Sequence, residues 1–130
     1  MLNNSNPRSQ GALDTRPYGR TDEGVNVAKG YWINQSDVTD EAGHAVYAKA
    51  VAEYLGRRGA KTLVFSQPGG RREVVEGTVR SRQLIQEFPD YESALEAYHS
   101  DEYQEIKKLR NNTATLDLVI VEGFDPSAPH

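Results

Sequence analysis

The sequence contains no cysteine, and it has only one methionine and one tryptophan in 130 residues. Without cysteine the chain can form no disulfide, no thiol nucleophile and no thiolate metal site, a composition that fits a reducing compartment. No apolar run approaches the length that spans a bilayer, and the N-terminus lacks the apolar block of a signal peptide. We therefore expect a cytoplasmic protein with no membrane partner.

An excess of positive charge is also missing. The chain has 15 Lys and Arg residues against 19 Asp and Glu residues, and its formal net charge is -4. Such a balance creates no general field that attracts a phosphate backbone, so nucleic acid is not an expected partner. The length suits one domain with its own core.

Motifs for metals and cofactors are absent as well. The histidines at positions 44, 99 and 130 do not have the paired spacings that place two imidazoles on one helix face. Gly69-Gly70 is not followed by the lysine and hydroxyl residue of a phosphate loop. Haem would need an axial ligand, for which His44 or His99 is available, but no other feature favours it. We expect no metal and no cofactor.

The residue pattern divides the chain into an arm, one domain and a tail. Residues 1–28 lack apolar periodicity and are expected to form an N-terminal arm, residues 29–124 the domain, and residues 125–130 a C-terminal tail. Alternating apolar residues and turn signals in the domain predict strands at Lys29–Val38, Lys61–Gln67, Arg72–Glu76, Arg82–Phe88 and Leu118–Glu122.

Two helical stretches lie between the strands. The first is expected to begin at Thr39 or Asp40 and to run to about Arg58, where Gly59 occupies the position of a C-terminal glycine. In the second, Asp90 is the predicted N-cap of a helix that carries Tyr98.

Ser100 interrupts this second stretch. Its side chain can cap a further helical segment, because Asp101 and Glu102 suit a first turn. The chain should therefore bend just after Tyr98-His99, at the edge of the core.

The order of strand, helix, strand, strand, helix, strand predicts an α+β fold, the ferredoxin-like βαββαβ plan with an antiparallel sheet. Both helices would then cover a single face of the sheet. However, Leu63-Val64-Phe65 and Leu118-Val119-Ile120-Val121 are apolar toward both faces. Since the domain has no further element to cover the second face, we expect a homodimer formed through that face of the sheet.

Several short sequence motifs are spread over the domain: Lys29-Gly30-Tyr31-Trp32-Ile33, Asp37-Val38-Thr39-Asp40, Val75-Glu76-Gly77, Glu87-Phe88-Pro89, Ala97-Tyr98-His99-Ser100, Glu102-Tyr103-Gln104 and Asp117-Leu118-Val119-Ile120-Val121-Glu122-Gly123. Taken together in this order, they resemble a bacterial domain-of-unknown-function family (number 1330) of the dimeric α/β-barrel superfamily. The resemblance extends from Lys29 to Gly123. The family usually enters its turn with Arg-Gly-Gly, whereas this chain has Ser66-Gln67-Pro68-Gly69-Gly70, so an anion contact by that arginine is not implied.

The resemblance implies a fold and an assembly, but not a particular reaction. In the superfamily two ferredoxin-like sheets close into a barrel at the dimer interface, and pockets often lie between each sheet and its helices. Relatives include cofactor-independent monooxygenases, lactone isomerases and haem enzymes, so the fold does not identify the chemistry.

Three residues are candidates for catalysis. His99 lies at the border of the apolar helix face, where half-burial would suit general acid or base work. Its structural alternative is a hydrogen bond to a carbonyl at the helix end. Tyr98 would donate to a substrate oxygen and Arg82 would stabilise an oxyanion. Tyrosines at helical spacing also fit a core role.

Four further residues are candidates for ligand contact: Trp32, Tyr47, Glu87 and Tyr103. Trp32 is also suited to packing under the helices. Arg82 and Glu87 are an odd number of residues apart on one strand, so their side chains should point to opposite faces. For Glu87 we favour a structural ion pair with Arg80, with Arg82 or with the other subunit.

Two functions remain open. The first is a cofactor-independent small-molecule enzyme, monooxygenase- or isomerase-like, acting on an enolisable or aromatic metabolite in a pocket between sheet and helices. The second is a non-catalytic homodimer that binds a metabolite or a partner protein.

Overall fold

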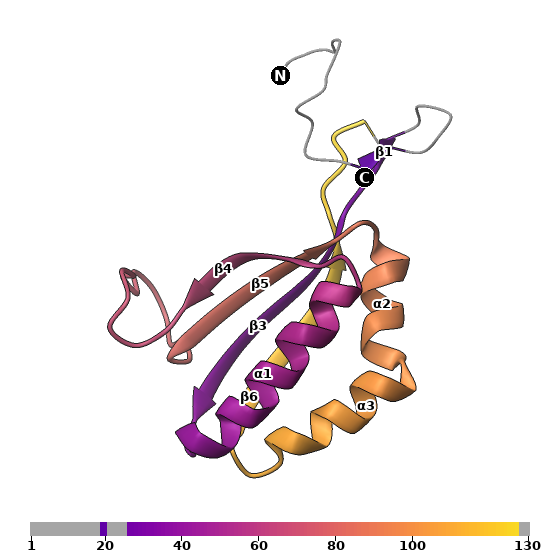
Figure 1. Ribbon diagram of the computed structural model, residues 1–130. Helices are drawn as coiled ribbons and strands as arrows, with labels where there is room; N and C mark the ends of the chain where they lie inside the picture. Colours follow the sequence, from indigo (N-terminus) through magenta and orange to yellow (C-terminus); the bar gives the residue numbers. More distant parts are fainter. Residues whose placement is uncertain (1–18, 21–25, 128–130) are drawn as a thin grey trace.

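The fold is built on a four-stranded antiparallel sheet, in a computed structural model that describes residues 19–20 and 26–127. Its strands are β3 (Gly30–Val38), β4 (Lys61–Ser66), β5 (Arg82–Phe88) and β6 (Ala114–Glu122), in the spatial order β4-β5-β3-β6 (Figure 1). This order confirms the predicted ferredoxin-like plan.

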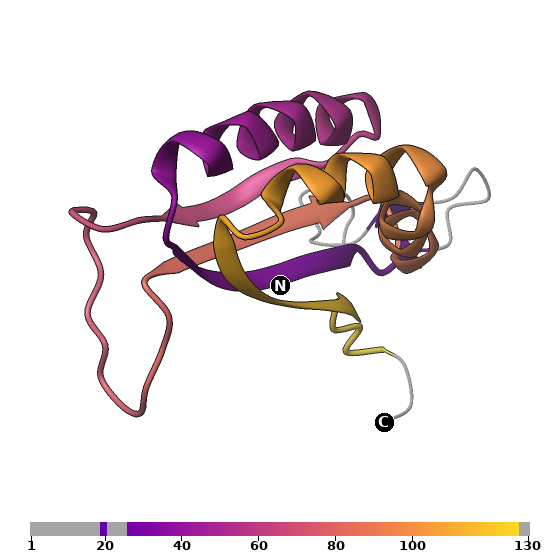
Figure 2. The ribbon, with the colours of Figure 1, turned by 90° about the horizontal axis from the view of Figure 1, so that it is seen from below.

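All the described helices of the domain lie on one face of the sheet (Figure 2). They are α1 (Glu41–Arg57), α2 (Tyr91–His99), α3 (Asp101–Lys107) and the short 3-10 helix η2 (Lys108–Arg110). The opposite face is bare of described helices and strands, as the sequence predicted.

The predicted caps are confirmed. The Asp90 side chain accepts a hydrogen bond from the backbone N–H of Ser93 at 2.7 Å, and the Ser100 hydroxyl accepts one from the backbone N–H of Tyr103 at 3.0 Å. Ser100 thus ends α2 and begins α3, which produces the bend. At the end of α1, Gly59 has a φ of 78°, and the predicted C-terminal glycine is in place.

Two strand predictions were wrong in extent or existence. Arg72–Glu76 is not a strand: residues 67–81 form a loop that pairs with no strand of the sheet, and the Arg72 side chain donates instead to the carbonyl oxygen of Arg80 and to Gln83 at the other end of the loop. The last strand begins at Ala114 rather than Leu118, because Ala114 pairs with Val38 and the ladder follows all of β3.

Most of the predicted arm and the end of the tail lie outside the described residues. Within the arm, the structure describes a two-stranded antiparallel ladder formed by β1 (Gly19–Arg20) and β2 (Asn26–Val27). The division into arm, domain and tail stays a prediction.

The core lies between the helices and the sheet. Its largest fully buried side chains are Trp32, Tyr54, Phe88 and Tyr103. The indole N–H of Trp32 donates to the carbonyl oxygen of Ala94 at 2.8 Å, which satisfies the polar atom of a buried ring. The packing role considered for Trp32 is therefore present.

The bare face of the sheet carries an apolar row, here called the outer row, that crosses all four strands. In the strand register Val64 lies beside Ile85, Ile85 beside Ile33, and Ile33 beside Val119. Ile33, Val64 and Val119 are 37%, 38% and 53% exposed. Contiguous exposed apolar side chains of this kind mark an interaction surface.

Candidate functional site

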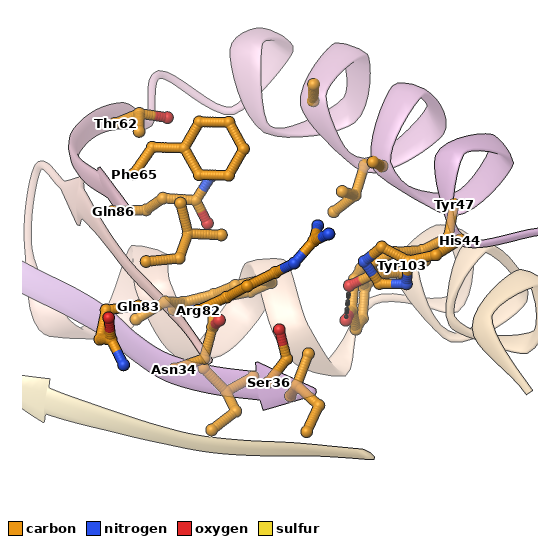
Figure 3. Close-up of a pocket in the computed structure, with 17 residues that line it drawn as sticks. Asn34, Ser36, His44, Tyr47, Thr62, Phe65, Arg82, Gln83, Gln86 and Tyr103 are labelled. Carbon is orange, nitrogen blue, oxygen red and sulfur yellow. Dashed lines mark hydrogen bonds between the residues drawn. The ribbon is translucent and has the colours of Figure 1, made fainter. Parts of the chain in front are cut away.

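A pocket of about 290 Å³ lies between α1 and the helix-covered face of the sheet (Figure 3). It exists because α1 presents the small side chains of Ala48 and Ala52 toward β4 and β5, where a larger residue would fill the space. Its lining comes from α1, α3 and all four strands of the sheet: Trp32, Asn34, Ser36, His44, Tyr47, Ala48, Val51, Ala52, Thr62, Phe65, Arg82, Gln83, Leu84, Gln86, Tyr103, Leu116 and Leu118.

The floor of the pocket contains buried polar side chains. Asn34, Ser36 and Gln86 are 8%, 5% and 8% exposed and point to the helix side of the sheet. None of the three side chains hydrogen-bonds another described residue. Their oxygen and nitrogen atoms are open to the pocket rather than sealed in the core, so these amides and this hydroxyl are available to a polar ligand.

Arg82 supplies the positive charge of the pocket. One of its terminal nitrogens, Nη2, donates to both carboxylate oxygens of Glu41, at 2.9 and 2.7 Å. The Arg82 side chain is 17% exposed, whereas that of Glu41 is 73% exposed. Glu41 therefore holds the guanidinium from the solvent side, and Nη1 and Nε make no hydrogen bond with another described residue. These donors are available to an oxygen in the pocket.

His44 lies beside Arg82 at the end of the pocket where Tyr47 and Tyr103 meet (Figure 3). Its Nδ1 is 3.3 Å from the hydroxyl oxygen of Thr113. Burial and, after it, the positive charge of Arg82 lower the pKa of His44 below its ordinary value of 6.5. The imidazole is therefore neutral at pH 7.

Two phenols close this end of the pocket. The hydroxyl groups of Tyr47 and Tyr103 are 2.8 Å apart, and Nη1 of Arg110 donates to Tyr103 at 3.0 Å and to Tyr47 at 3.4 Å. Burial raises the pKa of Tyr47 far above its ordinary value. Tyr47 thus stays protonated, and the two hydroxyl groups are engaged with one another and with Arg110.

Three of the sequence candidates lie away from this pocket. His99 is exposed at the end of α2, where Ser100 stops the helix. The Tyr98 hydroxyl accepts from Nζ of Lys107 at 3.0 Å. Glu87 lies on the bare face and accepts from the Tyr31 hydroxyl at 3.0 Å.

The arginines suggested as partners of Glu87 bind elsewhere. Arg80 forms ion pairs with Asp37 at 2.9 Å and with Asp117 at 2.7 Å, and Arg82 pairs with Glu41. The structural ion pair expected for Glu87 is therefore not found within the described part of the chain, although a phenol takes its place.

The other candidates meet in one site. Arg82, Trp32, Tyr47 and Tyr103 all line the pocket, contributed by β5, β3, α1 and α3. Sequence reasoning did not single out His44, Asn34, Ser36 or Gln86 for this site. The signal for His44 was its spacing: positions 44, 47 and 51 fall on one face of a helix.

The described residues offer little for a metal or a membrane. No group of three or more His, Asp or Glu side chains among them could hold a metal ion. No described helix is both long and apolar enough to cross a bilayer.

An antiparallel sheet covered on one face by helices, with a pocket between the two layers, defines an α+β protein of the ferredoxin-like class. Within that class the chain belongs to the family described as "Domain of unknown function (DUF1330)", which matches residues 29–124. No curated protein matches the chain.

Two solved structures illustrate what the fold is similar to. One is the RPA0582 protein of unknown function from Rhodopseudomonas palustris, with 16% identity, 76% of this chain and 85% of that chain covered, and a TM-score of 0.60. The other is SnoaB, a cofactor-independent oxygenase from Streptomyces nogalater, with 12% identity, 79% and 100% covered, and a TM-score of 0.46. At these identities the likeness concerns the fold alone.

Proposed function

We propose that the protein is an enzyme that acts on a small molecule bound between α1 and the sheet, using its own side chains. The observation that carries the proposal is the polar floor of the pocket. The side chains of Asn34, Ser36 and Gln86 line it, and they form no hydrogen bond with another described residue. Polar side chains that converge on a pocket and keep their donors and acceptors open to it are typical of a ligand site.

The size and lining of the pocket describe the ligand. Its volume of about 290 Å³ lies at the lower end of the range of ligand sites, roughly 300 to 1,000 Å³. Val51, Leu84, Leu116 and Leu118 provide an apolar wall. A small aromatic or branched aliphatic body fits this wall, with one polar end at the floor.

Arg82 determines the charge of that polar end. Glu41 binds only Nη2 of the Arg82 guanidinium. The N–H groups on Nη1 and Nε therefore remain available to an oxygen atom of a ligand. A carboxylate, an enolate or a polarised carbonyl is the group that such donors stabilise. The oxyanion role expected for Arg82 is retained in this proposal, whereas His99 and Tyr98 are given no part because they do not line the pocket.

The experiment compares matched ligands. A panel of small carboxylates that includes phenylacetate is tested against the corresponding amides by ligand-detected NMR, with wild-type protein and with Arg82→Met. The wild type should prefer the carboxylates, and Arg82→Met should weaken their binding about ten- to a hundredfold while leaving the amides unchanged, since a hydrogen bond to a charged group contributes roughly 1.5–3 kcal/mol.

Arg57→Met is the control, because Arg57 pairs with Glu102 on the surface at 2.7 Å. If neither carboxylates nor amides bind, the pocket is not a ligand site and the proposal fails. If ligands bind and none is converted, the protein is the non-catalytic binding module that was the alternative.

We also propose that the protein works as a homodimer through the outer row. No described helix or strand covers Ile33, Val64, Ile85 and Val119, and a second copy presents the same apolar row. The loop of residues 67–81, which carries exposed Val74, Val75 and Val79, extends on the same side of the sheet (Figure 2).

For the location, the proposal is the cytoplasm. A chain of 130 residues without cysteine suits a compartment in which thiols stay reduced.

A further inference from the structure

The hydrogen bonds around Thr113 determine which nitrogen of His44 carries the proton. The Thr113 hydroxyl oxygen is 2.8 Å from the carbonyl oxygen of Arg110. A carbonyl oxygen can only accept, so Thr113 must donate its single hydroxyl proton there. Toward Nδ1 of His44, at 3.3 Å, the same hydroxyl can then only accept. Neutral His44 is therefore protonated on Nδ1, and Nε2 carries the lone pair.

The surroundings keep this imidazole neutral. Burial opposes protonation most, followed by the positive charge of Arg82 on β5; Glu41 on α1 favours protonation, and Arg110 on η2 opposes it with the smallest effect of the four. Tyr47, whose hydroxyl is 2.8 Å from that of Tyr103 at this end of the pocket, remains protonated. His44 and Arg82 thus lie side by side in the lining of the pocket. The lone pair of the imidazole can accept a proton, and the guanidinium next to it can stabilise an oxyanion.

We propose that His44 is the general base of the site, that Thr113 is the positioning residue that fixes its Nδ1–H tautomer, and that the substrate is an enolisable carbonyl compound. The proposal rests on the proposed function, because it requires that the ligand occupies the pocket. It assigns chemistry to a histidine other than the one that the sequence favoured.

The step is a proton transfer with no redox partner. The C–H bond next to the substrate carbonyl breaks, and its proton goes to Nε2 of His44. The electron pair of that bond forms the carbon–carbon double bond, and the carbonyl π pair moves onto oxygen, where Arg82 stabilises the enolate. Return of the proton to the same carbon gives exchange with solvent, and its delivery to another carbon gives an isomer.

Phenylpyruvate is a suitable probe, because it has an aromatic body, a carboxylate and an enolisable carbon. Its hydrogen exchange in D₂O is followed by proton NMR, with the buffer rate subtracted. The wild type should accelerate exchange, and His44→Gln should lower the rate about 100-fold or more, the usual contribution of a general base.

Thr113→Val should lower the exchange rate about tenfold, because one ordinary hydrogen bond favours one tautomer over the other by about that factor. The affinity for phenylpyruvate should not change, and Thr113→Ser should restore the rate. Thr115→Val is the matched control, since Thr115 lies two residues after Thr113, on β6, and its side chain is exposed.

The tautomer itself is measured in the free protein. Nitrogen-15 NMR of the imidazole at neutral pH should show a protonated Nδ1 and an unprotonated Nε2 in wild type and in Thr113→Ser, and a mixture in Thr113→Val. This signature does not depend on catalysis, and it remains decisive in the wild type if Thr113→Val fails to fold.

The outcomes separate the two proposals. If phenylpyruvate binds in the pocket and its exchange does not exceed the buffer rate, or if Nε2 carries the proton in wild type, the roles of His44 and Thr113 are overturned and the pocket stands. If phenylpyruvate and the carboxylate panel both fail to bind, the proposed function itself is overturned.

Discussion

The half-buried position of His44 has a consequence for stability as well as for chemistry. Burial first, and the charge of Arg82 second, lower the pKa of this residue below 6.5 in the native state, and Arg110 adds to the effect while Glu41 opposes it. In the unfolded chain the pKa returns to its ordinary value. Between the two values the unfolded state binds more protons, so the free energy of unfolding falls as the pH is lowered through 6.5 toward the native pKa.

The prediction is a difference between two unfolding measurements. Urea unfolding at about pH 7.5 and about pH 5.5 should show a loss of stability in wild type that is smaller in His44→Gln, which has no group to protonate there. The second histidine, exposed His99, is the control position, and His99→Gln should keep the wild-type dependence. An equal loss in wild type and His44→Gln would contradict the assignment.

The same residue shows the limit of reading a site from a sequence. The sequence identified Arg82, Tyr47, Tyr103 and Trp32, because charge and aromatic rings at helix or strand spacing are visible in one dimension. It favoured His99 over His44, because the bend at Ser100 suggested an edge of the core. Whether a polar side chain faces a cavity or solvent depends on which small residues, here Ala48 and Ala52, leave space across the interface.

At the scale of elements, the bend between α2 and α3 depends on a single hydroxyl. Ser100 accepts from the backbone N–H of Tyr103 at 3.0 Å and is also bonded to the hydroxyl of buried Tyr54. Ser100→Ala should therefore lower the free energy of unfolding by about 1–2 kcal/mol, the usual cost of losing an N-cap. Urea unfolding measures the loss.

Ser93→Ala is the control, because Ser93 contributes its backbone N–H and not its side chain to the cap of α2. A stability loss below a few tenths of a kcal/mol in Ser100→Ala would show that the bend is held by packing alone.

Two glycines in different elements should respond in opposite directions to the same substitution. A Cβ on Gly30, in β3, would collide with the carbonyl oxygen of Asp90 and come within 2.7 Å of Cα of Tyr91. A Cβ on Gly56, in α1, would meet nothing within 4 Å. Gly30→Ala should thus destabilise the protein by roughly 1–3 kcal/mol, and Gly56→Ala should stabilise it by up to about 1 kcal/mol.

Thermal unfolding of the two variants side by side checks this pair. Equal midpoints would mean that β3 and the start of α2 can separate without cost, and the close approach that Gly30 permits would then have no structural role.

The elements themselves were largely predictable. Caps at Asp90 and Ser100 and the glycine after α1 are local signals that act within one turn, and they are confirmed. The strand expected at Arg72–Glu76 was wrong because strand pairing is not local: its valines are exposed in a loop, and the segment does not pair with the open edge of β4. The first half of β6 was missed because Thr115 and Asp117 on the bare face interrupt the apolar pattern.

At the scale of the whole molecule, the outer row predicts association. Val64, Ile85, Ile33 and Val119 form one line across the sheet, and stable dimers bury roughly 800 Å² on each partner, which a sheet face of four strands can supply. A charge placed in the centre of that face would be buried twice in a symmetric dimer, since each copy contributes the same patch.

Ile33→Glu should therefore convert the proposed dimer to a monomer at micromolar concentration, because an uncompensated buried charge costs roughly 3 to 5 kcal/mol. Sedimentation velocity of the purified protein measures the mass. Val46→Glu is the matched control, since Val46 is 57% exposed on α1, on the other layer of the molecule, and the change should leave the dimer intact. A wild-type protein that sediments as a monomer, or an Ile33→Glu variant that sediments as a dimer, would contradict the interface, because in either case the apolar row on β3 would not be what joins the two copies.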